Sequence, residues 1–170
     1  YVQPQDADAI RNDGFTNVIP IEEIKTIDGI SIYRTTGHHG FGQIGQMMGP
    51  VSGYVLKAEG FPTVYIMGDC RWEACIRDTV ERFNPDYIVV NSGGAIFPEF
   101  SKTDGPIIPD ENEVMQILDE LPSHIKLIAV HMDAIDHCQT TRAILRNEAT
   151  HHEADMSRLI IPEDGETVVL

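Results

Sequence analysis

Basic residues are scarce in this sequence. Lys and Arg together number 12 against 27 Asp and Glu, which gives a formal charge of -15 at pH 7. This excess of negative charge repels phosphate backbones and anionic membrane surfaces, and it leaves no basic patch for either. We therefore expect no membrane partner and no nucleic acid partner, unless a metal recruits the phosphates of a nucleic acid.

Long hydrophobic runs are also absent, because no apolar stretch reaches the roughly 18 residues that a transmembrane helix needs. The opening YVQPQDADAI lacks the pattern of a signal peptide. Three cysteines, Cys70, Cys75 and Cys138, leave one thiol unpaired and show no C-x-x-C spacing. These absences predict a cytoplasmic protein with reduced thiols.

A cysteine nucleophile is disfavoured by the sequence. Cys138 follows His137 directly, but neighbouring residues on a strand or helix point apart, and the sequence offers no third group to orient the pair. For Cys75 and Cys138 we predict the role of small buried hydrophobic residues, whereas the role of Cys70 stays open.

With 170 residues and 42% hydrophobic content, the chain is expected to form a single domain over residues 1–170 with a sizeable core. Runs rich in Val, Ile and Tyr between turn signals predict strands at 15–22, 29–36, 52–60, 62–69, 86–94 and 125–133. Helical periodicity predicts helices at 71–83, 110–121 and 138–149, and the tail 158–170 is expected to hold two short strands joined by a turn. This order predicts an α/β fold with a mixed sheet and covering helices.

The stretch TGHHGFGQIG at 36–45 places His38 and His39 among four glycines. Its glycines match the G-x-G-x-x-G fingerprint of dinucleotide-binding proteins, which requires a helix directly after the glycines. The following QMMGPVSGY contains two more glycines and a proline, so we expect no room for that helix and disfavour dinucleotide binding. Two adjacent imidazoles are better suited to binding a metal or carrying protons.

Polar side chains follow three of the predicted strands. His38 and His39 follow the strand at 29–36, Asp69 ends the strand at 62–69, and His131 lies at the end of the run AVH. Ligand sites in layered α/β folds gather beyond strand ends, so these side chains could converge on zinc or another borderline divalent ion. Two alternatives stay open: Asp69 could cap the helix at 71–83, and each histidine could be structural.

Four segments, TGHHGFG, VYIMGDCRW, VVNSGGAIF and AVHMDAIDHC, occur in this order. They resemble the C-terminal portion of metallo-β-lactamase-fold hydrolases, in the branch similar to ascorbate-6-phosphate lactonase. The resemblance implies part of an αββα sandwich in which a metal-bound hydroxide attacks the substrate. It also implies that His39 ligates one metal, His131 ligates a second, and Asp69 bridges them as a catalytic ligand. Zinc is the expected metal, as one or two divalent ions, with manganese or iron as alternatives.

The most diagnostic motif of that family, His-x-His-x-Asp-His, does not occur in the sequence. We therefore expect an incomplete fold that lacks its N-terminal part. Half a sandwich would expose one face of a sheet, which predicts a complementing N-terminal chain or a homo-oligomer.

Substrate contacts are expected from Asn91, Gly93 and Gly94 in VNSGGA, although a strand-to-loop turn would explain the same residues. His38 and His137 are further candidates on the substrate side. The expected function is metal-dependent hydrolysis of a small ester, lactone or phosphate-bearing substrate. The alternative is a non-catalytic metal-binding or interaction subunit that another chain completes.

Overall fold

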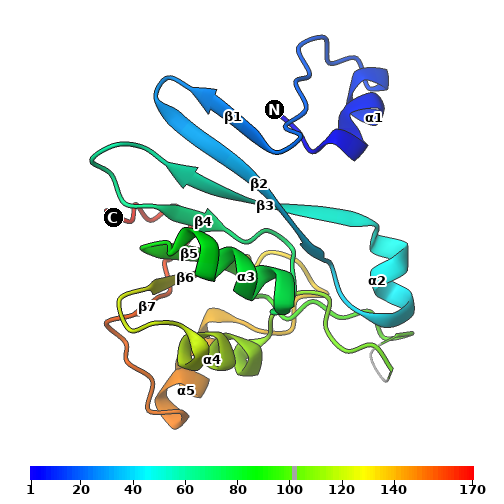
Figure 1. Ribbon diagram of the computed structural model, residues 1–170. Helices are drawn as coiled ribbons and strands as arrows, with labels where there is room; N and C mark the ends of the chain where they lie inside the picture. Colours follow the sequence, from blue (N-terminus) through cyan, green and yellow to red (C-terminus); the bar gives the residue numbers. More distant parts are fainter. Residues whose placement is uncertain (101–102) are drawn as a thin grey trace.

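Seven strands in chain order make one mixed sheet in the computed structural model, which describes residues 1–100 and 103–170 (Figure 1). Strands β1 to β4 pair antiparallel, and β4 to β7 pair parallel. The strands are β1 (Ile24–Ile27), β2 (Ile30–His38), β3 (Pro50–Lys57), β4 (Val64–Ile66), β5 (Tyr87–Asn91), β6 (Lys126–Val130) and β7 (Leu159–Ile160).

The helical elements connect the strands and cover one face of the sheet. They are the 3-10 helix η1 (Pro4–Asp6) and the α-helices α1 (Ala7–Asn12), α2 (Gly42–Met48), α3 (Ala74–Phe83), α4 (Glu111–Glu120) and α5 (Arg142–His151). Helices α3, α4 and α5 lie together on one side of the sheet, whereas α1 and α2 lie toward its ends (Figure 1). Within the described residues, no helix combines the length and the apolar character needed to cross a membrane.

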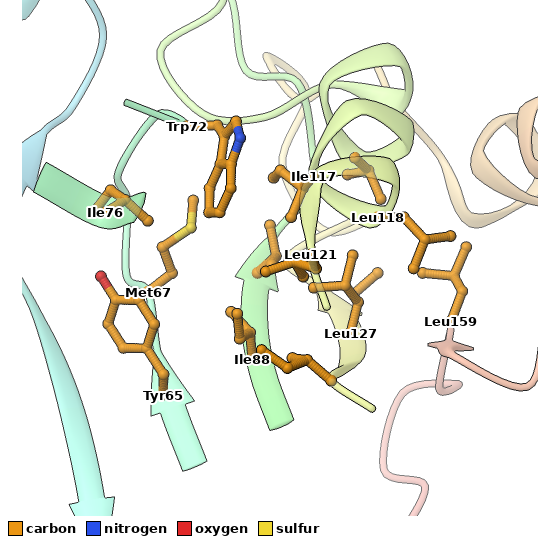
Figure 2. Packing of buried hydrophobic residues seen from close by; sticks show 14 of the residues in the cluster. Tyr65, Met67, Trp72, Ile76, Ile88, Ile117, Leu118, Leu121, Leu127 and Leu159 are labelled. Atoms are coloured by element: carbon orange, nitrogen blue, oxygen red, sulfur yellow. The ribbon is translucent and has the colours of Figure 1, made fainter. Parts of the chain in front are cut away.

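The main core lies between the sheet and helices α3, α4 and α5. Along β5, Ile88 and Val90 are buried while their neighbours are half-buried, as expected for a strand whose alternate side chains point to opposite faces. Figure 2 shows Ile88 and Leu127 of the sheet beneath Leu121, at the end of α4. The helices are therefore held on the sheet chiefly by apolar burial.

Most predicted elements are confirmed, but the strand predicted at 15–22 is wrong. That segment makes only an isolated bridge between Val2 and Pro20, and proline has no backbone N–H for a ladder. The first strand is instead β1, which forms a hairpin with β2. Asp28 and Gly29, both at positive φ, make the two-residue turn between them.

Helix boundaries and the tail also differ in part from the prediction. The helix predicted at 138–149 begins only at Arg142, because the Thr141 hydroxyl accepts the N–H of Ile144 at 3.1 Å and caps it. In the tail, the turn is present, with Glu166 N–H donating to Glu163 at 3.0 Å, but only β7 precedes it and no strand follows it in the described residues.

A helix does form in the glycine-rich segment, contrary to the prediction that none would fit. This helix, α2, begins at Gly42, includes Gly45 and ends at Met48, and its C-cap residue Gly49 has a φ of 75°. Strands β2 and β3 on either side of it are nevertheless direct antiparallel neighbours, with Ile32 opposite Leu56. A dinucleotide-binding unit needs two parallel strands around its helix. The fingerprint therefore does not apply here, but the reason is the antiparallel strand pairing and not the lack of a helix.

Candidate metal centre

The predicted ligands lie at one edge of the sheet. His39 follows β2, Asp69 follows β4 and His131 follows β6 directly. Strands β4 and β6 are parallel to each other through β5, and β2 runs in the same direction as β4 because two antiparallel pairings separate them. The carboxyl ends of these strands therefore meet at the same edge, where α/β folds place their ligand sites.

The pKa of His39 responds to the charges of the other two predicted ligands. Burial lowers the pKa of His39 most, Asp69 opposes this effect, and His131 and His137 lower the pKa further. His39 is therefore within electrostatic reach of the other three side chains. A lowered pKa keeps its imidazole neutral at neutral pH, which is the form that binds a metal.

Asp69 is oriented by Asn91. The Asn91 side-chain amide at the end of β5 donates to Asp69 Oδ1 at 2.6 Å. The alternative that Asp69 caps α3 is wrong, since the N-cap position belongs to Glu73, which makes no side-chain capping bond. The preceding residue, Gly68, has a φ of 72°, and a Cβ at this position would lie 2.7 Å from Ser52 O. The tight turn before Asp69 therefore requires glycine.

The donor set suits a borderline divalent ion, because imidazole nitrogen and carboxylate oxygen are both common ligands of zinc. Within residues 1–100 and 103–170, however, no group of three His, Cys, Asp or Glu side chains is close enough to hold a single ion. The described residues alone therefore do not form a three-ligand site for one ion.

Gly93 and Gly94 are buried and pack closely against the site from below. A Cβ on Gly93 would overlap His131 O and lie 2.7 Å from Cys138 Sγ. A Cβ on Gly94 would lie 2.6 Å from Thr140 Oγ1. Close packing alone therefore explains why both positions are occupied by glycine. Their contact with substrate stays a prediction.

His38 points away from His39, as neighbouring residues of an extended segment do. Its Nδ1 lies 2.8 Å from Glu73 Oε1, and its backbone N–H donates to the same oxygen at 2.8 Å. The ring remains largely exposed and lines a surface pocket of about 340 Å³ together with Phe41 and Gln46. Glu73 could not be predicted as the partner of His38, because the two residues are 35 positions apart in the sequence.

His137 is held at the site by an aromatic neighbour. Its ring stacks on Phe97 with the centroids 5.3 Å apart and the planes inclined by 20°. Phe97 in turn packs on a small apolar cluster, separate from the main core, that joins the loops around the site: Ile44, Ala95, Ile107 and Ile108. The sequence did not predict this cluster, whose members come from α2 and from distant parts of the connection between β5 and α4.

The thiols differ from the prediction for Cys75 and Cys138. Both are only half-buried, whereas Cys70 is fully buried. Burial raises the pKa of Cys70 to about 12, which makes it a poor nucleophile. Cys138 Sγ lies 3.7 Å from His131 Nδ1, so this thiol belongs to the site. The adjacent histidine in the sequence did not reveal this contact, because the partner is seven residues away.

The adjacent histidines His151 and His152 lie at the C-terminal end of α5. His151 is the last residue of the helix, and His152 Nε2 lies 2.8 Å from Asp119 Oδ2 on α4. Both histidines are exposed and distant from the sheet edge that holds the site.

No protein-family model matches the chain. The chain is 32% identical over 170 residues to UPF0173 protein YddR of Bacillus subtilis (strain 168), and the match covers 98% of this chain and 64% of that relative. It is 30% identical to the structure of a possible metal-dependent hydrolase from Veillonella parvula DSM 2008, with a TM-score of 0.89, covering 99% of this chain and 64% of the other.

The structure of isothiocyanate hydrolase from Delia radicum gut bacteria is 33% identical, also with a TM-score of 0.89, and covers 99% of this chain and 65% of the other. The metallo-β-lactamase fold protein YhfI from Bacillus subtilis is 16% identical with a TM-score of 0.54 and shows the fold alone. The chain thus spans slightly less than two thirds of the length of its similar relatives. Its mixed sheet with covering helices forms part of a metallo-β-lactamase fold, as predicted.

Proposed function

We propose that this protein is a metal-dependent hydrolase of a small electrophilic substrate, with His39, Asp69 and His131 as metal ligands. The observation that carries the proposal is that these residues follow β2, β4 and β6, whose carboxyl ends lie at one edge of the sheet, with Asn91 donating to the Asp69 carboxylate. The similarity to two hydrolase structures at 30% and 33% identity supports the same reaction class.

The residues at the site divide into ligands and substrate-side groups. A divalent ion bound there would supply Lewis-acid chemistry and lower the pKa of water. Asn91 fixes the orientation of the Asp69 carboxylate, and the neutral imidazole of His39 is ready to coordinate. His137, stacked on Phe97, presents a flat surface toward the organic part of the substrate.

Zinc is the first choice of metal on the chemistry of nitrogen and oxygen ligands, with manganese or iron as alternatives. Esters, lactones and phosphate-bearing molecules stay the proposed substrates, in line with the resemblance to the lactonase branch. The isothiocyanate hydrolase at 33% identity adds isothiocyanates, which also carry an electrophilic carbon. A cytoplasmic location belongs to the same proposal.

The second face of the sheet, opposite the face that α3, α4 and α5 cover, supports a proposal about partners. Ile66 on that face is 37% exposed, and Leu56 and Val64 are half-buried. We propose that a complementing N-terminal segment or chain, or a second copy, covers this face, because a sheet with one bare apolar face tends to associate.

The test is a panel of lactones, esters, phosphodiesters and isothiocyanates, assayed with the natural full-length protein and with His131→Ala. We expect turnover of at least one substrate and a loss of about 100-fold or more in the variant. His124→Ala, an exposed histidine at the opposite end of β6, is the matched control and should retain full activity.

Absence of turnover with every substrate, in protein that contains metal, would favour the alternative of a non-catalytic metal-binding or interaction subunit. Equal activity of His131→Ala and the natural protein would exclude His131 from the site.

A further inference from the structure

The first turn of α4 contacts the segment that follows Asp69 directly, and it reaches the segments that carry His39 and His131 through intermediate residues. Its N-cap residue is Asp110, whose carboxylate accepts the N–H of Glu113 at 2.9 Å. In a complete capping box, the Glu113 carboxylate would return to the Asp110 N–H. Here the Glu113 side chain turns away from its own helix, which frees it for a contact elsewhere.

Glu113 holds the segment that follows Asp69. Its two carboxylate oxygens accept the N–H of Trp72 at 2.7 Å and Nε of Arg71 at 2.6 Å. The Arg71 guanidinium also donates to Pro106 O, and its backbone N–H donates to His38 O at 3.0 Å. The segments that carry Asp69 and His39 are therefore fixed to each other and to α4.

Glu111, in the same helical turn, reaches the His131 side of the site. It accepts a hydrogen bond from the hydroxyl of Thr140, which is 1% exposed. The Thr140 backbone N–H donates to Gly93 O at 2.9 Å, and Gly93 packs directly on His131 O. A second chain of contacts thus runs from α4 to the end of β5 and the start of the His131 loop.

The ion pair between Arg71 and Glu113 is largely shielded from solvent. The side chains of Arg71 and Glu113 are only 15% and 9% exposed. Apolar residues would fill such positions at least as stably, because a buried ion pair loses its hydration and gains little net stability. A buried pair does fix direction and distance, since each carboxylate oxygen has a specific donor.

We propose that Glu111 and Glu113 are positioning residues that set the spacing of the metal ligands through Thr140 and through Arg71. This inference rests on the proposed metal site. It adds that α4 aligns the segments that carry the proposed ligands. The two glutamates touch no ligand themselves, so their substitution acts through the loops.

The test compares Glu113→Gln and Thr140→Val with matched controls in the natural full-length protein. Glu81→Gln makes the same change at an exposed position of α3, and Thr150→Val makes the same change in an exposed turn of α5. Zinc affinity is measured by competition with a chromophoric chelator. We expect each test variant to bind zinc about tenfold more weakly, and each control to stay within about twofold of the natural protein.

A second readout needs no metal. In the metal-free protein, the NMR signal of the Asn91 side-chain amide reports its bond to Asp69. We expect this signal to shift toward that of a free amide in Glu113→Gln and Thr140→Val and to stay unchanged in both controls. Thr140→Val alters only a hydroxyl, so it keeps the test decisive if Glu113→Gln folds poorly.

Unchanged Asn91 signals together with unchanged zinc affinities in both test variants would overturn the inference. Equal losses of zinc affinity in the control variants would also overturn the inference, because the losses would then not depend on the contacts of Glu113 and Thr140. If the natural protein binds no zinc or other divalent metal, the proposed function fails, and the Asn91 signal alone decides whether α4 positions the site.

Discussion

At the scale of single residues, the site depends on a carboxylate that has a neutral hydrogen-bond donor beside it. The Asn91 amide donates to Asp69 Oδ1 at 2.6 Å, and in the proposed metal site the other oxygen would coordinate the ion. Hydrogen bonds to ligating carboxylates are typical of metal sites, since they fix the direction of the ligand without competing for the charge.

Asn91→Ala should therefore weaken metal binding by about tenfold while the fold stays intact. The measurement is chelator competition, with circular dichroism as the check on folding. Asn112→Ala, an exposed asparagine on α4, should leave the affinity unchanged. An unaltered affinity in Asn91→Ala would show that Asp69 needs no orientation.

Gly37 illustrates how closely the segment before the histidines packs on the segment after Asp69. A Cβ at Gly37 would lie 2.5 Å from Cys70 Sγ and 2.9 Å from Cys70 Cβ, and Cys70 is fully buried. We expect Gly37→Ala to lower the free energy of unfolding by about 1–3 kcal/mol through overpacking.

The double variant Gly37→Ala with Cys70→Ala should recover part of this loss, because removing the sulfur makes room for the new methyl group. Urea unfolding of both single variants and the double variant measures the coupling. Purely additive effects would contradict the close contact between the two residues.

The predicted ligands could be identified from the sequence because each is a polar residue at the end of an apolar run. Their partners could not. Glu73, Phe97 and Cys138 reach the histidines only through the fold, and nothing in the local sequence of any histidine indicates which distant side chain will face it.

At the scale of elements, helices α3 and α4 are joined by Glu120. Its carboxylate accepts Nε of Arg77 at 2.7 Å and the indole N–H of Trp72 at 2.7 Å. These bonds, with that of Arg77 as the largest effect, lower the pKa of Glu120 to about 2. A carboxylate with a lowered pKa stabilises the fold above its unfolded pKa, and this contribution is lost as the pH falls toward 2.

Glu120→Gln should thus be less stable than the natural protein at pH 6, by about 0.5–1 kcal/mol because the ion pair is partly exposed. The difference should shrink as the pH falls from about 4.5 toward 2. Urea unfolding across this range measures it, with Glu59→Gln in an exposed turn as the control. A difference that does not change with pH would contradict the assigned pKa.

Periodicity was sufficient to predict the long elements. The helices α3 and α4 and the strands β5 and β6 occur where their apolar spacing indicated. The errors arise from short elements that depend on turns. The strand β1 is only four residues long and exists because Asp28 and Gly29 turn it onto β2, and α2 fits between glycines that normally exclude a helix.

At the scale of the whole molecule, the helices cover one face of the sheet and the other face remains apolar in part. Ile66, on this second face, is 37% exposed. The proposed covering partner, a complementing segment or a second copy, would lie on this second face.

Ile66→Glu in the natural protein should therefore lower the melting temperature or dissociate the assembly, since a charge would be forced into a covered apolar face. Ile144→Glu, on α5 and 41% exposed, is the control with similar exposure outside this face. Thermal unfolding and sedimentation equilibrium measure the two effects. If both variants behave alike, the second face is free in solution.

The central claim is that His39, Asp69 and His131 bind metal together, and elemental analysis tests it most directly. The account predicts at least about one equivalent of a divalent transition metal in the natural full-length protein, and a loss of most of it in Asp69→Ala. Less than about half an equivalent in the natural protein after incubation with zinc, manganese and iron, or the same content in Asp69→Ala, would contradict it.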